Sequence, residues 1–302
     1  MNEQTLLVNA ENIQVDFKTE GGIAQAVRDV SFKIYKGQTV ALVGESGSGK
    51  SISARVLMKL LPKSAIVGKA TRITLHGEDM SGYTEQDMRK IRGKKIGMIF
   101  QEPMTSLNPI YTVGDQIGEI IREHNRTISK QALREQVLSL LTEMQLPDPE
   151  KRIDQYPHQM SGGQRQRVMI AMALANKPDL LIADEPTTAL DVTVQAEILN
   201  LLKRLQEKFN MGVLLITHDL TIVRKYADWV YVMQHGRDQL NNLFPDLYDS
   251  KQNAELPAEC MYALKKGDNA GWPYIYYDPI QHKKILAPEY GGDGKKEADP
   301  VR

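Results

Sequence analysis

The sequence has 302 residues, 41% of them hydrophobic and 25% charged, which is usual for a globular protein with a sizeable core. Its 38 basic and 38 acidic side chains cancel, so no overall field draws it to nucleic acid, and we expect no nucleic-acid partner. The single cysteine, Cys260, excludes an internal disulfide and a cysteine-rich metal site, and this favours a cytosolic protein.

The first 35 residues predict a small antiparallel sheet. Residues 13–17 and 30–34 alternate between apolar and polar side chains on either side of a glycine pair at 21–22. The N-terminus lacks the basic start and apolar run of a signal peptide, and no apolar stretch approaches the ~18 residues that span a bilayer. We therefore expect any work at a membrane to depend on other subunits.

From Gln38 onward, short apolar runs alternate with helical patterns, which predicts a parallel sheet buried on both faces. The predicted strands are residues 39–43, 95–100, 180–183 and 213–217.

The first of these strands leads into a glycine-rich loop of the pattern G-x-x-x-x-G-K-[ST]. Glycine tolerates positive φ and so lets the backbone N–H groups of such a loop point at phosphate oxygens. In this pattern Lys50 reaches the β- and γ-phosphates of ATP, and Ser51 ligates Mg²⁺. A flexible linker is the alternative for an isolated match, but here a strand precedes and a helical pattern, running to Leu61, follows. The predicted loop comprises Gly44, Glu45, Ser46, Gly47, Ser48, Gly49, Lys50 and Ser51.

Residues 102–160 predict a helical subdomain, and a new helix begins after it. Apolar side chains fall on one helical face at 113–121 and again at 133–141. Ser161 is placed as the N-cap of the next helix, where exposed glycine amides and the positive helix end offer a second phosphate-binding surface. By itself this segment would more often be an ordinary cap.

The strand at 180–183 delivers two carboxylates at its C-terminal end, where open α/β sheets bind ligands. Asp184 would hold Mg²⁺ through water, and Glu185 would act as the general base or polarise the attacking water. An isolated Asp-Glu pair is usually a solvated loop, but the phosphate loop upstream favours the functional interpretation.

Residues 160–166, Met-Ser-Gly-Gly-Gln-Arg-Gln, resemble the signature sequence of ABC transporter nucleotide-binding domains. The resemblance covers roughly residues 5–237, predicts one ATPase domain over residues 1–237, and implies an α/β P-loop NTPase fold. This fold has a RecA-like parallel sheet core, an N-terminal antiparallel β subdomain and an α-helical signature subdomain. The nucleotide-binding part of the signature is Ser161, Gly162, Gly163 and Gln164.

Further residues take their roles from the same resemblance. Gln101 corresponds to the Q-loop glutamine, which touches Mg²⁺ or water and reports to the membrane subunit. Asp191 lies in a segment resembling the D-loop, and His218 corresponds to the switch histidine near the γ-phosphate. A lone histidine after a strand would more often be structural. Phe17 is the aromatic best suited to stack on adenine, although packing within its strand explains it almost as well.

The resemblance also implies partners. In this family the signature of one subunit closes over the ATP held by another, so we expect a homo- or heterodimer of ATPase domains. Residues 100–109 and 184–195 resemble oligopeptide, dipeptide and nickel importer ATPases. Residues 156–159 and 168–173 are most similar to the first ATPase half of microcin C-type peptide importers.

An importer ATPase would work at the cytoplasmic face of the plasma (inner) membrane, bound peripherally to transmembrane permease subunits. Peptide cargo would be handled indirectly, through the permease and a binding protein. The alternative is a non-transport ABC ATPase acting on DNA or the ribosome. Such proteins usually carry a long coiled-coil insertion or tandem cassettes, neither of which the sequence shows.

Composition shifts after Arg237: the last 65 residues hold 8 of the 19 aromatic residues and lose helical periodicity. Residues 267–274 and 287–292 resemble a fragment of a quinone-dependent, sorbosone-oxidising dehydrogenase propeller, of which 65 residues supply little more than one blade. We interpret 238–302 as an irregular, poorly packed tail of chimeric origin that contributes nothing to turnover. A natural C-terminal extension with its own small fold is the alternative, and sugar oxidation by the tail is a third hypothesis.

Overall fold

The structure is a computed structural model that describes residues 5–19, 22–101, 106–188 and 190–233, together with three short strands further along the chain. The chain divides into two units, Met1–Ala263 and Leu264–Arg302. The three strands are β11 (Met261–Lys265), which spans the division, and the antiparallel pair β12 (Ile275–Asp278) and β13 (Lys283–Leu286). The predicted boundary after Arg237 lies outside the described residues, as do segments 267–274 and 287–292, for which the sequence predicted a dehydrogenase resemblance.

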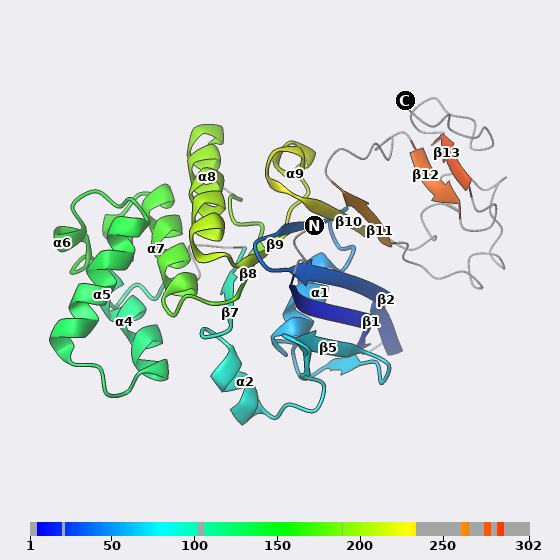
Figure 1. The fold of residues 1–302 in the computed structure, drawn as a ribbon, viewed down its shortest axis with the longest axis horizontal. Helices are drawn as coiled ribbons and strands as arrows, with labels where there is room; N and C mark the ends of the chain where they lie inside the picture. The colour runs from blue at the N-terminus through cyan, green and yellow to red at the C-terminus, as the bar shows by residue number, and fades with distance from the viewer. Residues whose placement is uncertain are drawn as a thin grey trace. The chain divides into compact units, whose positions relative to one another are not determined.

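An antiparallel sheet forms the N-terminal part of the first unit (Figure 1). Its two long strands pair around the predicted turn at 21–22, and both are longer than the alternating segments that predict them. The strand order is β2-β1-β5-β6, and β4 also pairs with β1. The strands are β1 (Leu6–Thr19), β2 (Gly22–Tyr35), β4 (Ala65–Val67), β5 (Arg72–Leu75) and β6 (Glu78–Asp79).

A parallel sheet forms the centre of the same unit, with strand order β10-β3-β9-β8-β7. Every residue of β7, β8 and β9 is buried, as the apolar runs predict. The predicted α/β fold with a parallel core is therefore confirmed. The strands are β3 (Thr39–Gly44), β7 (Ile96–Ile99), β8 (Leu180–Asp184), β9 (Gly212–Ile216) and β10 (Trp229–Met233).

Helices surround this sheet and extend into a helical subdomain (Figure 1). Helix α1 packs against β3 and β9, α9 against β3, and α7 against β7. Within the subdomain, α4 packs against both α5 and α7. The helices are α1 (Lys50–Leu57), α2 (Glu85–Ile91), α4 (Val113–His124), α5 (Lys130–Glu143), α6 (Pro149–Arg152), α7 (Gly162–Leu174), α8 (Val192–Phe209) and α9 (Leu220–Tyr226).

The two faces of the parallel sheet contribute side chains to two separate hydrophobic cores. Leu181 and Leu215 point into the core shared with the helical subdomain and α8. Their neighbours Leu180 and Leu214 point into the core shared with α1 and the antiparallel sheet. Because side chains alternate along a strand, each strand joins both cores and fixes its C-terminal end between them. Within the described part of the chain, no helix has the length and apolar character needed to cross a membrane.

Candidate functional site

The predicted phosphate loop connects β3 to α1 and closes around the amine of Lys50. The Nζ atom of Lys50 donates to the carbonyl oxygens of Gly44 at 2.9 Å and Glu45 at 2.7 Å. The loop needs positive φ at Gly44, Gly47 and Gly49, which have values of 155°, 83° and 86°. Burial lowers the pKa of Lys50, against the opposing effect of nearby carboxylates led by Glu185. Glu45, Ser46 and Gly47 form the exposed tip, while Ser48 and Gly49 are buried.

The loop lies close to backbone on two sides. A Cβ atom added to Gly44 would lie 2.0 Å from the carbonyl oxygen of Met233 in β10. A Cβ atom on Gly49 would lie 2.9 Å from the carbonyl oxygen of Ala26 in β2. These positions therefore require glycine for two reasons: the backbone has positive φ, and a side chain would overlap neighbouring backbone atoms.

Ser51 and Asp184 meet beside the loop. The Oγ atom of Ser51, in the first turn of α1, donates to Oδ1 of Asp184 at 2.7 Å. Asp184 ends β8 and is fully buried, and its Oδ2 atom is buried without a hydrogen-bond partner. Burial raises the pKa of Asp184, and the Ser51 hydrogen bond opposes this. An unsatisfied buried carboxylate oxygen is costly unless a ligand completes it.

Glu185 is the next residue, and three donors surround its carboxylate. Nε2 of Gln101 lies 2.9 Å and Oγ1 of Thr188 lies 3.1 Å from Oε2, while Nδ1 of His218 lies 3.1 Å from Oε1. Burial raises the pKa of the Glu185 carboxyl, but hydrogen bonds from His218 and Thr188 outweigh burial and place that pKa below its ordinary value. Glu185 is therefore ionised at neutral pH and can orient a water or accept its proton.

The residues of the signature segment form a separate group at the start of α7. The Oγ atom of Ser161 accepts from the backbone N–H of Gln164, and Oε1 of Gln164 accepts from the backbone N–H of Ser161. This reciprocal pair is a capping box. It leaves Ser161 and Gly162 exposed and ties the Ser161 side chain to its own helix.

Two other predicted residues lie in ordinary structural surroundings. Asp191 is the N-cap of α8, and its Oδ1 atom accepts from the backbone N–H of Val194 at 2.9 Å. Phe17 is half-buried in β1 opposite Ala24 and packs against the core of the antiparallel sheet. Their proposed contacts with nucleotide stay predictions.

Sequence reasoning missed two residues of the site. Thr188 reaches Glu185 through a turn whose shape no motif specifies. Gln166 is buried in α7 and donates to the carbonyl oxygen of Pro186, which joins the signature helix to the turn after β8. Gln166 ends the signature segment 160–166, but its contact with Pro186 depends on how α7 packs against that turn, which the sequence does not show.

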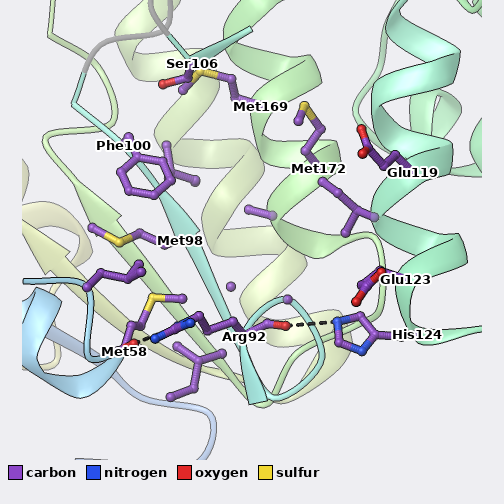
Figure 2. A pocket seen from close by; sticks show the side chains of 17 residues that line it. Met58, Arg92, Met98, Phe100, Ser106, Glu119, Glu123, His124, Met169 and Met172 are labelled. Carbon is purple, nitrogen blue, oxygen red and sulfur yellow. Dashed lines mark hydrogen bonds between the residues drawn. The ribbon is translucent and has the colours of Figure 1, made fainter. Parts of the chain in front are cut away.

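A mostly apolar cavity of about 520 Å³ lies beside Phe100 (Figure 2). It is lined from β7, α4 and α7, and Phe100 on its wall immediately precedes Gln101. Glu119 and Glu123 supply acidic groups, and Nε2 of His124 bonds the carbonyl oxygen of Arg92 at 2.9 Å.

The geometry is that of a nucleotide-binding cassette, and comparison with known proteins decides the family. Residues 27–188 match the family described as ABC transporter. The chain belongs to the ABC transporter family. It is an ABC-type ATPase domain that binds ATP, as the arrangement of the phosphate loop and carboxylates indicates.

Within the ABC family, the chain is similar to ATP-binding proteins of peptide transport. The chain is 53% identical over 231 residues to the dipeptide transport ATP-binding protein DppD of Bacillus subtilis, covering 76% of this chain and 69% of DppD. It is 52% identical over 233 residues to the oligopeptide transport ATP-binding protein OppD of the same species, covering 77% of this chain and 65% of OppD.

A solved ABC cassette supports the fold. The chain resembles the cassette MJ0796, described as a dimeric post-hydrolysis state bound to ADP and Pi. The TM-score is 0.67 at 30% identity, over 75% of this chain and 94% of MJ0796. The predicted P-loop NTPase fold and ATP as ligand are thereby confirmed.

Proposed function

We propose that this ABC ATPase is the energising subunit of a peptide-class importer and acts as a peripheral protein at the cytoplasmic face of the plasma (inner) membrane. The observation that carries the ATPase chemistry is the Glu185 carboxylate, held between Gln101 and His218 at the end of β8, beside the Lys50 loop. The similarity to dipeptide and oligopeptide transport ATPases supports the cargo class.

Each residue of the cluster has a distinct part in ATP hydrolysis. The amine of Lys50, which now bonds loop carbonyls, would turn to the β- and γ-phosphates when ATP enters the loop. Glu185 would orient a water and take its proton as the water oxygen bonds to the γ-phosphorus. The bond between that phosphorus and the bridging oxygen then breaks, which yields ADP and phosphate. His218 would keep the Glu185 carboxylate and the γ-phosphate in fixed positions relative to each other.

The residues present fit Mg²⁺. The buried Oδ2 atom of Asp184 has no hydrogen-bond partner and could accept a hard cation, and the hydroxyl of Ser51 and the amide oxygen of Gln101 would be further oxygen ligands. Among the described residues there is no group of three or more His, Cys, Asp or Glu side chains that could hold a metal by itself. This suits Mg²⁺ in a nucleotide site, since phosphates and waters complete its shell. Mg²⁺ would neutralise charge on the phosphates.

A second ATPase domain would complete the site. Ser161 and Gly162 are exposed at the N-terminus of α7, where backbone N–H groups and the helix dipole favour a phosphate. The capping box ties Ser161 to its own helix and not to the chain's own phosphate loop. We therefore propose that these residues cover ATP bound by a partner domain in a homo- or heterodimer. The dimeric description of MJ0796 supports this arrangement.

The cavity beside Phe100 would be the binding site for a segment of the permease. Its apolar walls and acidic groups, Glu119 and Glu123, fit a short cytoplasmic segment with apolar and basic side chains (Figure 2). Because Phe100 adjoins Gln101, a segment seated there would affect the donor on Glu185. Peptide cargo would be bound by the permease and its binding protein and not by this subunit.

Reconstitution tests the transport assignment. The full chain, incorporated with its permease into vesicles, should drive ATP-dependent accumulation of labelled di- and oligopeptides. Lys50→Ala should abolish accumulation, because the phosphates lose their cation. Co-purification with DNA or ribosomes, in place of permease subunits, would contradict the proposal.

A further inference from the structure

Thr188 is a third donor to the Glu185 carboxylate, alongside the two from the Q-loop and switch positions. It is exposed in the turn after β8, and its Oγ1 atom lies 3.1 Å from both Oε2 and the backbone carbonyl oxygen of Glu185. The sequence separation is three residues, so the contact depends on the local turn alone.

The turn leaves the Thr188 hydroxyl free to serve the carboxylate. The backbone N–H of Thr188 already donates to the carbonyl oxygen of Glu185 at 3.2 Å. A hydroxyl has one proton and can donate to only one of its two acceptors at a time. Donation to the charged carboxylate is the stronger choice, because hydrogen bonds to ionised acceptors are about twice as strong as neutral ones.

Thr188 differs from the other two donors in where it is anchored. Gln101 follows β7 and His218 follows β9, so both can separate from Glu185 when those segments move. Thr188 belongs to the same turn as Glu185 and moves with it. Glu185 itself has a left-handed backbone with φ of 46°, a conformation that needs local support in a non-glycine residue.

We propose that Thr188 is a positioning residue for ATP hydrolysis: its hydroxyl holds the Glu185 carboxylate in its orientation while Gln101 and His218 exchange partners during the cycle. The inference rests on the proposed function of Glu185 as the group that orients the attacking water. It predicts an effect on the chemical step and none on ATP binding.

Three variants of the full chain test this inference by ATPase kinetics with ATP binding measured in parallel. Thr188→Val keeps the side-chain shape without the hydroxyl and should lower kcat about three- to tenfold with KM for ATP unchanged, as expected for one hydrogen bond lost at the chemical step. Thr188→Ala should do the same, which guards against a steric effect of valine. Thr188→Ser retains the hydroxyl and should stay within about twofold of the wild-type rate.

A double variant separates this inference from the function on which it rests. In the Glu185→Gln background, Thr188→Val should leave the residual rate unchanged, because Thr188 acts through the carboxylate. Normal kcat in Thr188→Val and Thr188→Ala, or equal losses in Thr188→Ser and Thr188→Val, would overturn the positioning role. Normal hydrolysis by Glu185→Gln alone would instead overturn the proposed function.

Discussion

At the scale of single residues, backbone conformation positions the two carboxylates of the candidate site. Glu185 follows directly on β8 with φ of 46°, and its backbone N–H donates to the carbonyl oxygen of Ile216 at 3.0 Å. The chain therefore turns sharply where the sheet ends. This turn holds Asp184 buried under the phosphate loop and presents Glu185 to donors from two neighbouring strands.

Replacement of Gly44 should lower the stability of the fold. Its φ of 155° suits only glycine, and a Cβ atom there would lie 2.0 Å from the Met233 carbonyl oxygen. Gly44→Ala should lower the free energy of unfolding by about 2–4 kcal/mol, because both strain and overlap must be relieved. Gly82→Ala is the matched control, since a Cβ atom there meets nothing within 4 Å. Equal denaturation midpoints for the two variants would disprove this.

At the scale of elements, sequence patterns predicted the fold well and helix ends less well. The apolar pattern after the phosphate loop continues to Leu61, but α1 ends at Leu57. Lys59 has φ of 50° and the backbone N–H of Leu60 turns back to the carbonyl oxygen of Arg55. Such a left-handed stop, followed closely by Pro62, satisfies the last carbonyls of the helix. Periodicity alone does not show where this happens.

The sequence predicted most residues of the candidate site but not every contact between them. Asp184 ends one parallel strand, and Lys50, Ser51 and Glu185 follow such strands, whose C-terminal ends share one edge of the sheet. Their meeting could therefore be expected from order and spacing. The contact of Thr188 could not, because it depends on the exact shape of one turn.

Two serine N-caps allow the role of the signature helix to be separated from its stability. Ser161 caps α7 and Ser129 caps α5, and each accepts from the N–H three residues later. Ser161→Ala and Ser129→Ala should each cost about 1 kcal/mol of stability, since each leaves one helix-end donor without its cap. Only Ser161→Ala should also lower the ATPase rate several-fold. A similar loss of ATPase activity in both variants would argue against a nucleotide role for Ser161.

Asp179 joins the antiparallel sheet to the parallel sheet. His76 lies 3.0 Å from its carboxylate, Lys95 3.6 Å and Lys36 4.0 Å. Burial raises the pKa of Asp179, but the hydrogen bond from His76 and the charges of His76, Lys95 and Lys36 outweigh it and place that pKa below its ordinary value. A carboxyl with a depressed pKa stabilises the fold above its unfolded pKa, and this contribution disappears as pH falls through the folded value.

Asp179→Asn should therefore lower the free energy of unfolding at pH 7 by about 1 kcal/mol, the size of one charged hydrogen bond near the surface. The difference from wild type should shrink toward zero as pH falls through the lowered pKa of Asp179. Asp154→Asn, which breaks the more exposed pair with Arg134 on the helical subdomain, is the control and should cost less. Urea unfolding at several pH values measures both, and a difference for Asp179→Asn that does not change with pH would refute the linkage.

At the scale of the whole molecule, the proposed catalytic groups and the signature residues belong to different elements of one unit. The Lys50 loop and Glu185 lie at the C-terminal ends of strands of the parallel sheet. Ser161 is exposed at the start of α7. Gln166 connects the two parts through the carbonyl oxygen of Pro186. A cycle in which ATP joins two such chains, and hydrolysis separates them, follows if each signature covers the ATP of its partner.

ATP hydrolysis by Glu185→Gln is the most direct test of this account. The variant should bind ATP as the wild-type chain does and form an ATP-dependent dimer. It should lose hydrolysis by about 100-fold or more, because the attacking water has lost its base. Glu207→Gln, on an exposed face of α8, should retain the wild-type rate. Hydrolysis at the wild-type rate by Glu185→Gln would contradict the account.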